Sequence, residues 1–287
     1  MSPYAPVAAD VRASPVRLTP CSPAYARLTE VLPAFDVVEL AAGVPLPDGP
    51  GWFSGRALAE DPAALEEYLA MEAADSLRNN GTDARADVVA TFGLHRYAWP
   101  ACLLVTLPWF LHRRVPRLPS DAFAYHRATR RLAVRTGEFS CLPGDPAALT
   151  PHARTTDEEG LRTAVRQAVA EHLTPLLDAF RRRMRRGDRA LWGMATDEIV
   201  EGLWYLGSLL GEEERARRET ELLLPGHTTP FAQGAGFRSL AGPDGETLTT
   251  RTRASCCMFY TVRPADTCVT CPRTCDTERV ERLASAG

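Results

Sequence analysis

Apolar residues recur at helical spacing along most of the chain, and this pattern predicts a predominantly α-helical protein. One clear helix should begin after Asp61, which is a typical N-cap, and end at Gly81. A second helical segment begins near Asp83. Its apolar continuation over residues 97–111 contains two prolines, so we expect an interruption at Pro100 and a buried pair of helices.

Three longer helical stripes follow in the second half of the chain, over residues 156–186, 189–210 and 212–224. The first stripe opens on acidic residues, which suit the positive end of a helix dipole. Pro175 is expected to kink or restart that helix. A final short helix should follow Asp276.

Extended structure is predicted in fewer places. Between residues 122 and 141 apolar residues alternate with small or polar ones, which indicates a β-hairpin or small meander. Short strands are expected at residues 37–40 and 247–250. The fold class is therefore α+β, predominantly α-helical, with the hairpin or meander near 122–141 and a cysteine-bearing hairpin at the C-terminus.

Proline and glycine suggest how the chain is divided. Residues 1–57 are rich in proline and read as an irregular arm packed along the body. The run Pro-Gly-Asp-Pro at residues 143–146 is the best candidate boundary. We expect an N-terminal lobe of arm, helices and small β-meander over residues 1–145. A helical lobe over residues 146–287 would end in the cysteine-bearing segment 251–287.

Composition and charge narrow the range of functions. All 33 Lys+Arg positions are arginine, yet the formal net charge is −3, which argues against nucleic-acid binding. The first residues resemble no secretory signal, and the apolar run 97–111 is too short and too broken for a bilayer, which needs about 20 residues. We therefore expect a cytoplasmic protein without a transmembrane segment, whose thiols stay reduced.

Cysteines supply the candidate chemistry. Four of the eight lie within sixteen residues: Cys256, Cys257, Cys268 and Cys271. They could meet at one inorganic centre if the β-prone run 258–262 and the turn after it double the chain back. Of the others, Cys102 lies in an apolar run and is expected to be buried and inert. Cys21 and Cys141 have no partner by spacing.

Several centres are compatible with four clustered thiols. Zinc sites usually take two C-x-x-C knuckles, and the adjacent pair Cys256 and Cys257 fits such a knuckle poorly. A [2Fe–2S] cluster is wider and suits four cysteine ligands, so it is favoured, with zinc, a disulfide or free thiols as alternatives. Cys275 could extend the set toward a [4Fe–4S] cluster, but an unliganded position at the start of the last helix is preferred.

The pattern Cys-Cys-x10-Cys-x2-Cys, preceded by Arg253 and followed by Pro272, resembles the C-terminal signature of FhuF-like ferric siderophore reductases. The run Leu-Trp-Gly at residues 191–193 and the long helix before it are also similar to that family. The resemblance covers about residues 60–275, strongly at the cysteines and loosely elsewhere. The helical region is also similar to part of the siderophore synthetases, but nothing resembles their ATP-binding portion.

The resemblance implies a [2Fe–2S] cluster bound by Cys256, Cys257, Cys268 and Cys271, with Cys275 outside the pattern. It implies a cytoplasmic enzyme that reduces ferric siderophores of the hydroxamate type, with no catalytic residues beyond the cluster ligands. No flavin or nicotinamide fingerprint appears, so an external electron donor such as a ferredoxin-like protein is expected. The alternative is a non-enzymatic iron or redox sensor, or an interaction protein stapled by zinc. An accessory role in siderophore biosynthesis is a third reading.

Arginines and aromatic residues could serve such a site. Arg251, Arg253, Arg263 and Arg273 flank the cysteines and could stabilise a reduced cluster or guide an acidic donor, or could be solvated surface groups. Two basic runs, residues 112–117 and 181–186, suggest contact with the donor or peripheral contact with anionic lipid. The aromatic residues that could line a siderophore cleft, or belong to the core, are Trp99, Trp109, Trp192, Trp204 and Tyr205. His227 should be exposed and lacks companions for a metal site.

Overall fold

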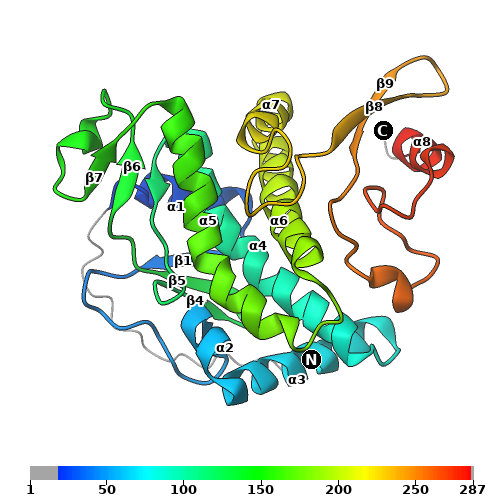
Figure 1. Ribbon diagram of the computed structural model, residues 1–287, viewed down its shortest axis with the longest axis horizontal. Coiled ribbons are helices and arrows are strands. Elements are labelled where there is room, and N and C mark those ends of the chain that lie inside the picture. Colours follow the sequence, from blue (N-terminus) through cyan, green and yellow to red (C-terminus); the bar gives the residue numbers. More distant parts are fainter. Residues whose placement is uncertain (1–18, 286–287) are drawn as a thin grey trace, which may run out of the picture.

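The computed structural model describes residues 19–285 (Figure 1). Helices make up about half of the part it describes, and eight of them are α-helices. They are α1 (Ser22–Val31), α2 (Gly55–Glu60), α3 (Pro62–Asn80), α4 (Ala86–His112), α5 (Glu158–Arg181), α6 (Asp188–Leu209), α7 (Glu213–Leu223) and α8 (Asp276–Ala284). The predicted fold class, α+β and mostly helical, is confirmed.

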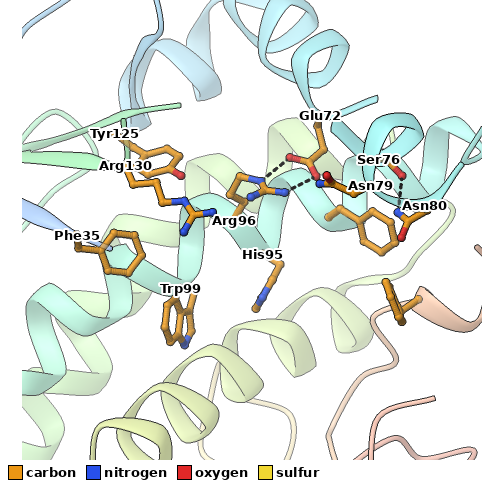
Figure 2. A pocket seen from close by; sticks show the side chains of 12 residues that line it. Phe35, Glu72, Ser76, Asn79, Asn80, His95, Arg96, Trp99, Tyr125 and Arg130 are labelled. Atoms are coloured by element: carbon orange, nitrogen blue, oxygen red, sulfur yellow. Dashed lines mark hydrogen bonds and ion pairs between the residues drawn. The ribbon is translucent and has the colours of Figure 1, made fainter. Parts of the chain in front are cut away.

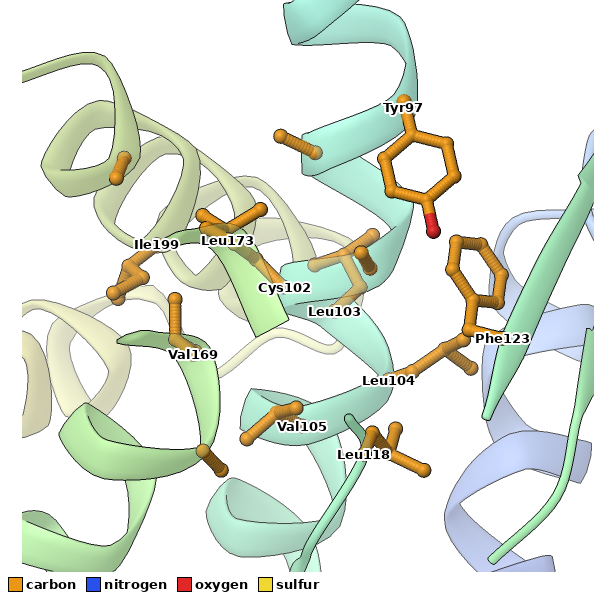
Figure 3. Packing of buried hydrophobic residues seen from close by; sticks show 14 of the residues in the cluster. Tyr97, Cys102, Leu103, Leu104, Val105, Leu118, Phe123, Val169, Leu173 and Ile199 are labelled. Atoms are coloured by element: carbon orange, nitrogen blue, oxygen red, sulfur yellow. The ribbon is translucent and has the colours of Figure 1, made fainter. Parts of the chain in front are cut away.

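The centre of the fold is α4, which α1, α3, α5 and α6 surround. Figure 3 shows its apolar side chains between Val169 and Leu173 of α5 on one side and Phe123 on the other. By length and composition α4 could cross a bilayer, yet 78% of its most apolar 18-residue window is buried within the protein. Cys102 lies in this core, as expected.

The predicted interruption of this helix is wrong, because α4 runs through both prolines without a break. A proline cannot donate to the carbonyl four residues earlier, so Pro108 leaves the Leu104 carbonyl without its helical partner. The Tyr25 hydroxyl of α1 donates to that carbonyl at 3.1 Å. Tertiary contacts thus satisfy a group that the local sequence leaves unpaired. The run is continuous, not broken.

The remaining long helices agree closely with the predicted ranges. Asp61 caps α3 by accepting from the Ala63 amide, and Gly81 ends it with φ of 67°. Asp157 caps α5, which also passes through its proline at position 175 without ending. Residues 1–18 of the proline-rich arm lie outside the described residues. The described part of that arm contains α1, which packs on α4, and a short strand over Asp36–Glu39, close to the predicted residues 37–40.

Strands form three small sheets. They are β1 (Asp36–Glu39), β2 (Trp52–Ser54), β3 (Val115–Pro116), β4 (Phe123–His126), β5 (Arg131–Val134), β6 (Phe139–Cys141), β7 (Ala153–Thr155), β8 (Phe237–Ala241) and β9 (Thr247–Arg251). The predicted hairpin is β4–β5, extended by β1 and β2 into the order β1-β5-β4-β2. The third predicted strand, β6, does not continue a meander, because it pairs with β3 and β7 in a separate sheet.

The C-terminal part lies beside α6 and on the opposite side of the molecule from β6 and β7 (Figure 1). The hairpin β8–β9 leads into residues 253–275, here called the cysteine segment, and α8 follows. The β-prone run predicted at 258–262 is instead a 3₁₀ turn over Phe259–Thr261.

One hydrophobic core includes residues from Cys21 to Ala235. The division into lobes 1–145 and 146–287 stays a prediction.

Candidate metal centre

A buried carboxylate on α6 holds the start of the cysteine segment. Asp197 is fully buried, and its two oxygens accept from the backbone amides of Ala254 at 2.9 Å and Ser255 at 2.8 Å. The same carboxylate pairs with Arg251 at 2.5 Å and with Arg253 at 3.4 Å. Hydrogen bonds to an ionised acceptor are the stronger kind. Asp197 therefore fixes the backbone that leads directly into Cys256.

A glycine on the same helix allows the cysteine segment to approach closely. A Cβ added at Gly193 would lie 3.1 Å from the Ala254 carbonyl oxygen and 3.3 Å from the Ser255 Cβ. A larger residue would push the segment outward by a few tenths of an ångström. This contact gives a physical reason for the Leu-Trp-Gly run on which the family resemblance partly depends.

Buried arginines complete the support. Arg279 of α8 is 2% exposed and donates to the carbonyls of Thr274, Arg251 and Cys271. Arg186, which follows α5, donates to the Ser255 hydroxyl at 2.8 Å and to the Cys256 carbonyl. These bonds tie three separate elements to the cysteine segment. They also place positive charge around the thiols.

Two of the thiols accept backbone N–H groups. The Met258 amide donates to Cys256 Sγ at 3.4 Å, and the Arg273 amide donates to Cys271 Sγ at 3.4 Å. Met258 has a left-handed backbone with φ of 66°, which turns the chain back immediately after the cysteine pair. Amide donors to cysteine sulfur are a feature by which proteins tune iron–sulfur clusters.

Cys257 and Cys268 approach each other across the segment. The Cys268 thiol hydrogen-bonds to Cys257 and, with the Phe259 amide and the charges of Arg253 and His95, lowers the pKa of Cys257 to about 5. The same contact raises the pKa of Cys268. One sulfur is therefore held as a thiolate, the form that ligates metals. Cys257 and Cys268, eleven positions apart in the sequence, thus lie close together, as expected if the chain doubles back between them.

The four predicted ligands are partly buried or buried, and Cys271 is the most buried of them. Cys275 is exposed and occupies the N-cap of α8, at the start of the last helix as expected. Within residues 19–285 no three or more His, Cys, Asp or Glu side chains converge on the position of a single ion. His227 is exposed, as predicted.

The four thiols, their N–H donors and the surrounding arginines fit a thiolate-bound redox cluster. Residues 253–273 match the family model described as FhuF 2Fe-2S C-terminal domain. This match confirms the resemblance and identifies the cysteine segment as a [2Fe–2S] domain. No curated protein matches the chain. The assignment of Cys256, Cys257, Cys268 and Cys271 as the individual ligands stays a prediction.

Two of the four flanking arginines are not solvated surface groups, whereas Arg263 and Arg273 are exposed, as the surface alternative expected. Arg251 is fully buried and bridges Asp197 and Glu201, and Arg253 has a side chain that is only 13% exposed. By contrast, the basic run at 112–117 is engaged in ion pairs elsewhere, since Arg114 pairs with Asp145. That run therefore offers little free charge for a donor or for lipid.

The five aromatic residues divide between core and surface. Trp109 is fully buried. Trp192 packs edge-on against Phe231, and Trp204 donates to Glu213. Trp99 and Tyr205 line a cavity that Arg253 of the cysteine segment also lines.

Sequence reasoning missed the supporting residues Asp197 and Arg279. An acid within an apolar helix segment, next to a second acid at Glu198, was the available signal for Asp197. Such an acid is rarely buried without a partner. No spacing rule would have paired it with residues 54 to 58 positions later.

Proposed function

We propose that the protein is a ferric siderophore reductase of the FhuF-like kind, acting on hydroxamate-type complexes in the cytoplasm. The observation that carries the proposal is the match of the cysteine segment to the 2Fe-2S domain of that family. The bound cluster would supply one electron at a time. The sequence has no flavin or nicotinamide fingerprint, so a separate protein such as a ferredoxin would supply the electron.

The chemistry follows from the preferences of iron. Hydroxamates bind Fe(III) through hard, negatively charged oxygens, and those oxygens hold the softer Fe(II) much less tightly. Transfer of one electron from the reduced protein to the complex converts Fe(III) to Fe(II) and returns the protein to its oxidised state. The metal then leaves its carrier. The chain needs only to hold the complex beside the cysteine segment and to exclude competing oxidants.

Anaerobic stopped-flow spectroscopy tests the proposal. The purified protein should be brown, with visible absorbance that bleaches on addition of one electron per molecule. A ferric trihydroxamate should restore that absorbance, and a ferrous-specific chelator should capture one Fe(II) per reduced protein. A redox sensor would bleach in the same way but would not be reoxidised by the complex. A colourless, zinc-loaded protein would contradict the proposal.

A further inference from the structure

Two adjoining cavities open between α4, the β4–β5 hairpin and the cysteine segment. Their volumes are about 430 and 590 Å³, within the range of small-molecule sites. Both are lined by Phe35, His95, Trp99 and Arg130, and these four residues define what we call the aromatic cleft. Figure 2 shows the four side chains facing the same space.

The cysteine segment forms part of the wall. Phe259, two residues after Cys257, lines one cavity, and Arg253, three residues before Cys256, lines the other. The rings of Phe259 and Phe92 lie 6.3 Å apart and close that end of the cleft. His95 and Arg253, which both line the cleft, act electrostatically on the Cys257 thiol. A molecule in the cleft would therefore lie beside Arg253 and Phe259 of the cysteine segment.

The walls are suited to a molecule with flat, apolar parts. The Trp99 ring lies between Phe35, at a centroid distance of 5.7 Å, and Tyr205, at 6.0 Å. Tyr205 is 46% exposed, which is unusual for a large apolar side chain. Aromatic surfaces left open to solvent in a concave site are typical of ligand binding.

The charges of the cleft are balanced except at one position. His95 Nδ1 contacts the buried Glu198 carboxylate at 2.8 Å, and Arg96 pairs with Glu72 at 2.7 Å. Arg253 pairs with Asp197. For Arg130, no side-chain hydrogen bond or ion pair is found within residues 19–285.

The backbone at Arg130 supports a binding role. Arg130 has φ of 59°, a left-handed conformation that arginine seldom adopts and that glycine or asparagine would accept more easily. It lies at the end of the turn that joins β4 to β5. An exposed guanidinium with no side-chain partner among the described residues, at a backbone position that suits other residues better, points to a ligand.

We propose that the aromatic cleft binds the ferric siderophore, with Phe35, Trp99 and Tyr205 packing on its apolar spacers and Arg130 donating hydrogen bonds to its negatively charged oxygen donors. This inference deepens the proposed function and rests on it. Hydroxamate and catecholate complexes share the same feature, a shell of anionic oxygens around Fe(III). The guanidinium can donate to two such oxygens at once.

Binding can be measured without electron transfer, because gallium(III) forms complexes of the same shape but is not reduced. We would titrate the holoprotein with the gallium complex of a linear trihydroxamate by calorimetry, and in parallel with a gallium tricatecholate. The variants are R130Q and W99L. Matched controls are R131Q, whose side chain pairs with Asp36 outside the cleft, and W204L, whose ring packs on Phe237 of β8 and lines neither cavity.

R130Q and W99L should each raise Kd for the gallium complex about ten- to hundredfold, the range for losing a charged hydrogen bond or a buried ring contact. They should raise KM for the ferric complex by the same factor and leave kcat within about twofold, since neither touches the cysteines. R131Q and W204L should change Kd by less than about twofold. A larger Arg130 effect with the catecholate than with the hydroxamate would identify the more anionic class as the ligand. The reverse would identify the hydroxamate.

Arg130 is exposed and contacts no ion-pair partner in the described part of the chain, so R130Q should keep the cluster absorbance of the unmodified protein. Unchanged Kd and KM in R130Q and W99L, with reduction of the ferric complex intact, would overturn the cleft and leave the proposed function standing. Binding that depends on Arg130 without any reoxidation by the ferric complex would do the opposite. It would establish the cleft and overturn the reductase.

Discussion

Replacement of Asp197 by asparagine is the sharpest test of how the cysteine segment is held. The amide has the shape of the carboxylate but no charge, and one of its two ends is a donor. It would face the amides of Ala254 and Ser255, which now donate at 2.9 and 2.8 Å. At least one of these contacts would become donor against donor. Arg251 would also lose its ion-pair partner at 2.5 Å.

The size of the effect follows from burial. Both Asp197 and Arg251 are fully buried, and removal of one partner of a buried pair costs about 3–5 kcal/mol. Arg251 keeps Glu201 at 2.8 Å, so we expect the lower end, about 3 kcal/mol. At about 2–4 °C per kcal/mol for a chain somewhat smaller than this one, Tm should fall by roughly 6–12 °C.

Three measurements check this expectation. Iron and acid-labile sulfide per chain report cluster content, which should fall to less than about half because the ligand backbone is loosened. Differential scanning calorimetry reports Tm, and hydrogen exchange reports protection of the Ala254 and Ser255 amides. Asp178→Asn is the matched control, because Asp178 is 62% exposed and pairs only at the surface. It should change stability by less than about 0.5 kcal/mol. Full cluster content and unchanged amide protection in Asp197→Asn would refute the anchoring role.

The other predictions concern the ligands, the helix contact and acid stability. Cys257→Ser should abolish most of the visible absorbance while Cys275→Ser keeps it; equal loss in both would enlarge the ligand set. Gly193→Ala should gain about 1 kcal/mol of helix propensity but force the cysteine segment away from α6. Calorimetry should therefore show little change in Tm while the iron content falls. Unchanged iron content would show that the close contact at Gly193 is not needed. The Arg114 hydrogen bond lowers the pKa of Asp145, so its stabilisation is present above the unfolded value of about 3.9 and is lost as pH falls through the lower folded value. The difference in unfolding free energy between the unmodified protein and Asp145→Asn should therefore shrink below about pH 4, and a constant difference down to pH 2 would contradict it.

The local sequence was sufficient for most helices because their signals are short-range. Asp61 and Gly81 bound α3 as predicted, since a cap acts within one turn. The predicted break in α4 was wrong, because a residue distant in sequence supports the helix there. The continuity of α4 depends on Tyr25, 79 residues from Leu104 along the chain, and no window around Pro108 contains that information.

The same distinction applies to the site. The cysteine spacing located the metal centre, because the ligands of one cluster lie close together in sequence. The residues that hold it are on other elements: Asp197 and Gly193 on α6, and Arg186 after α5. The expectation that the flanking arginines could be solvated failed for Arg251, which is fully buried. Asp197, which is distant from Arg251 in the sequence, pairs with it inside the protein, and this contact buries the arginine.

Charge around the cysteine segment links its support to its chemistry. Arg279 is 2% exposed and donates its hydrogen bonds to three backbone carbonyls. The carboxylate of Asp276 lies 3.9 Å from its guanidinium. Its positive charge is therefore balanced less completely than that of Arg251, which contacts two carboxylates. An added electron increases the negative charge at the thiolates, and nearby positive charge with low solvent access favours that state. Asp197 opposes this effect while it holds the backbone. Asp197 and the arginines thus both hold the backbone of the cysteine segment, and their charges act in opposite directions on its thiols.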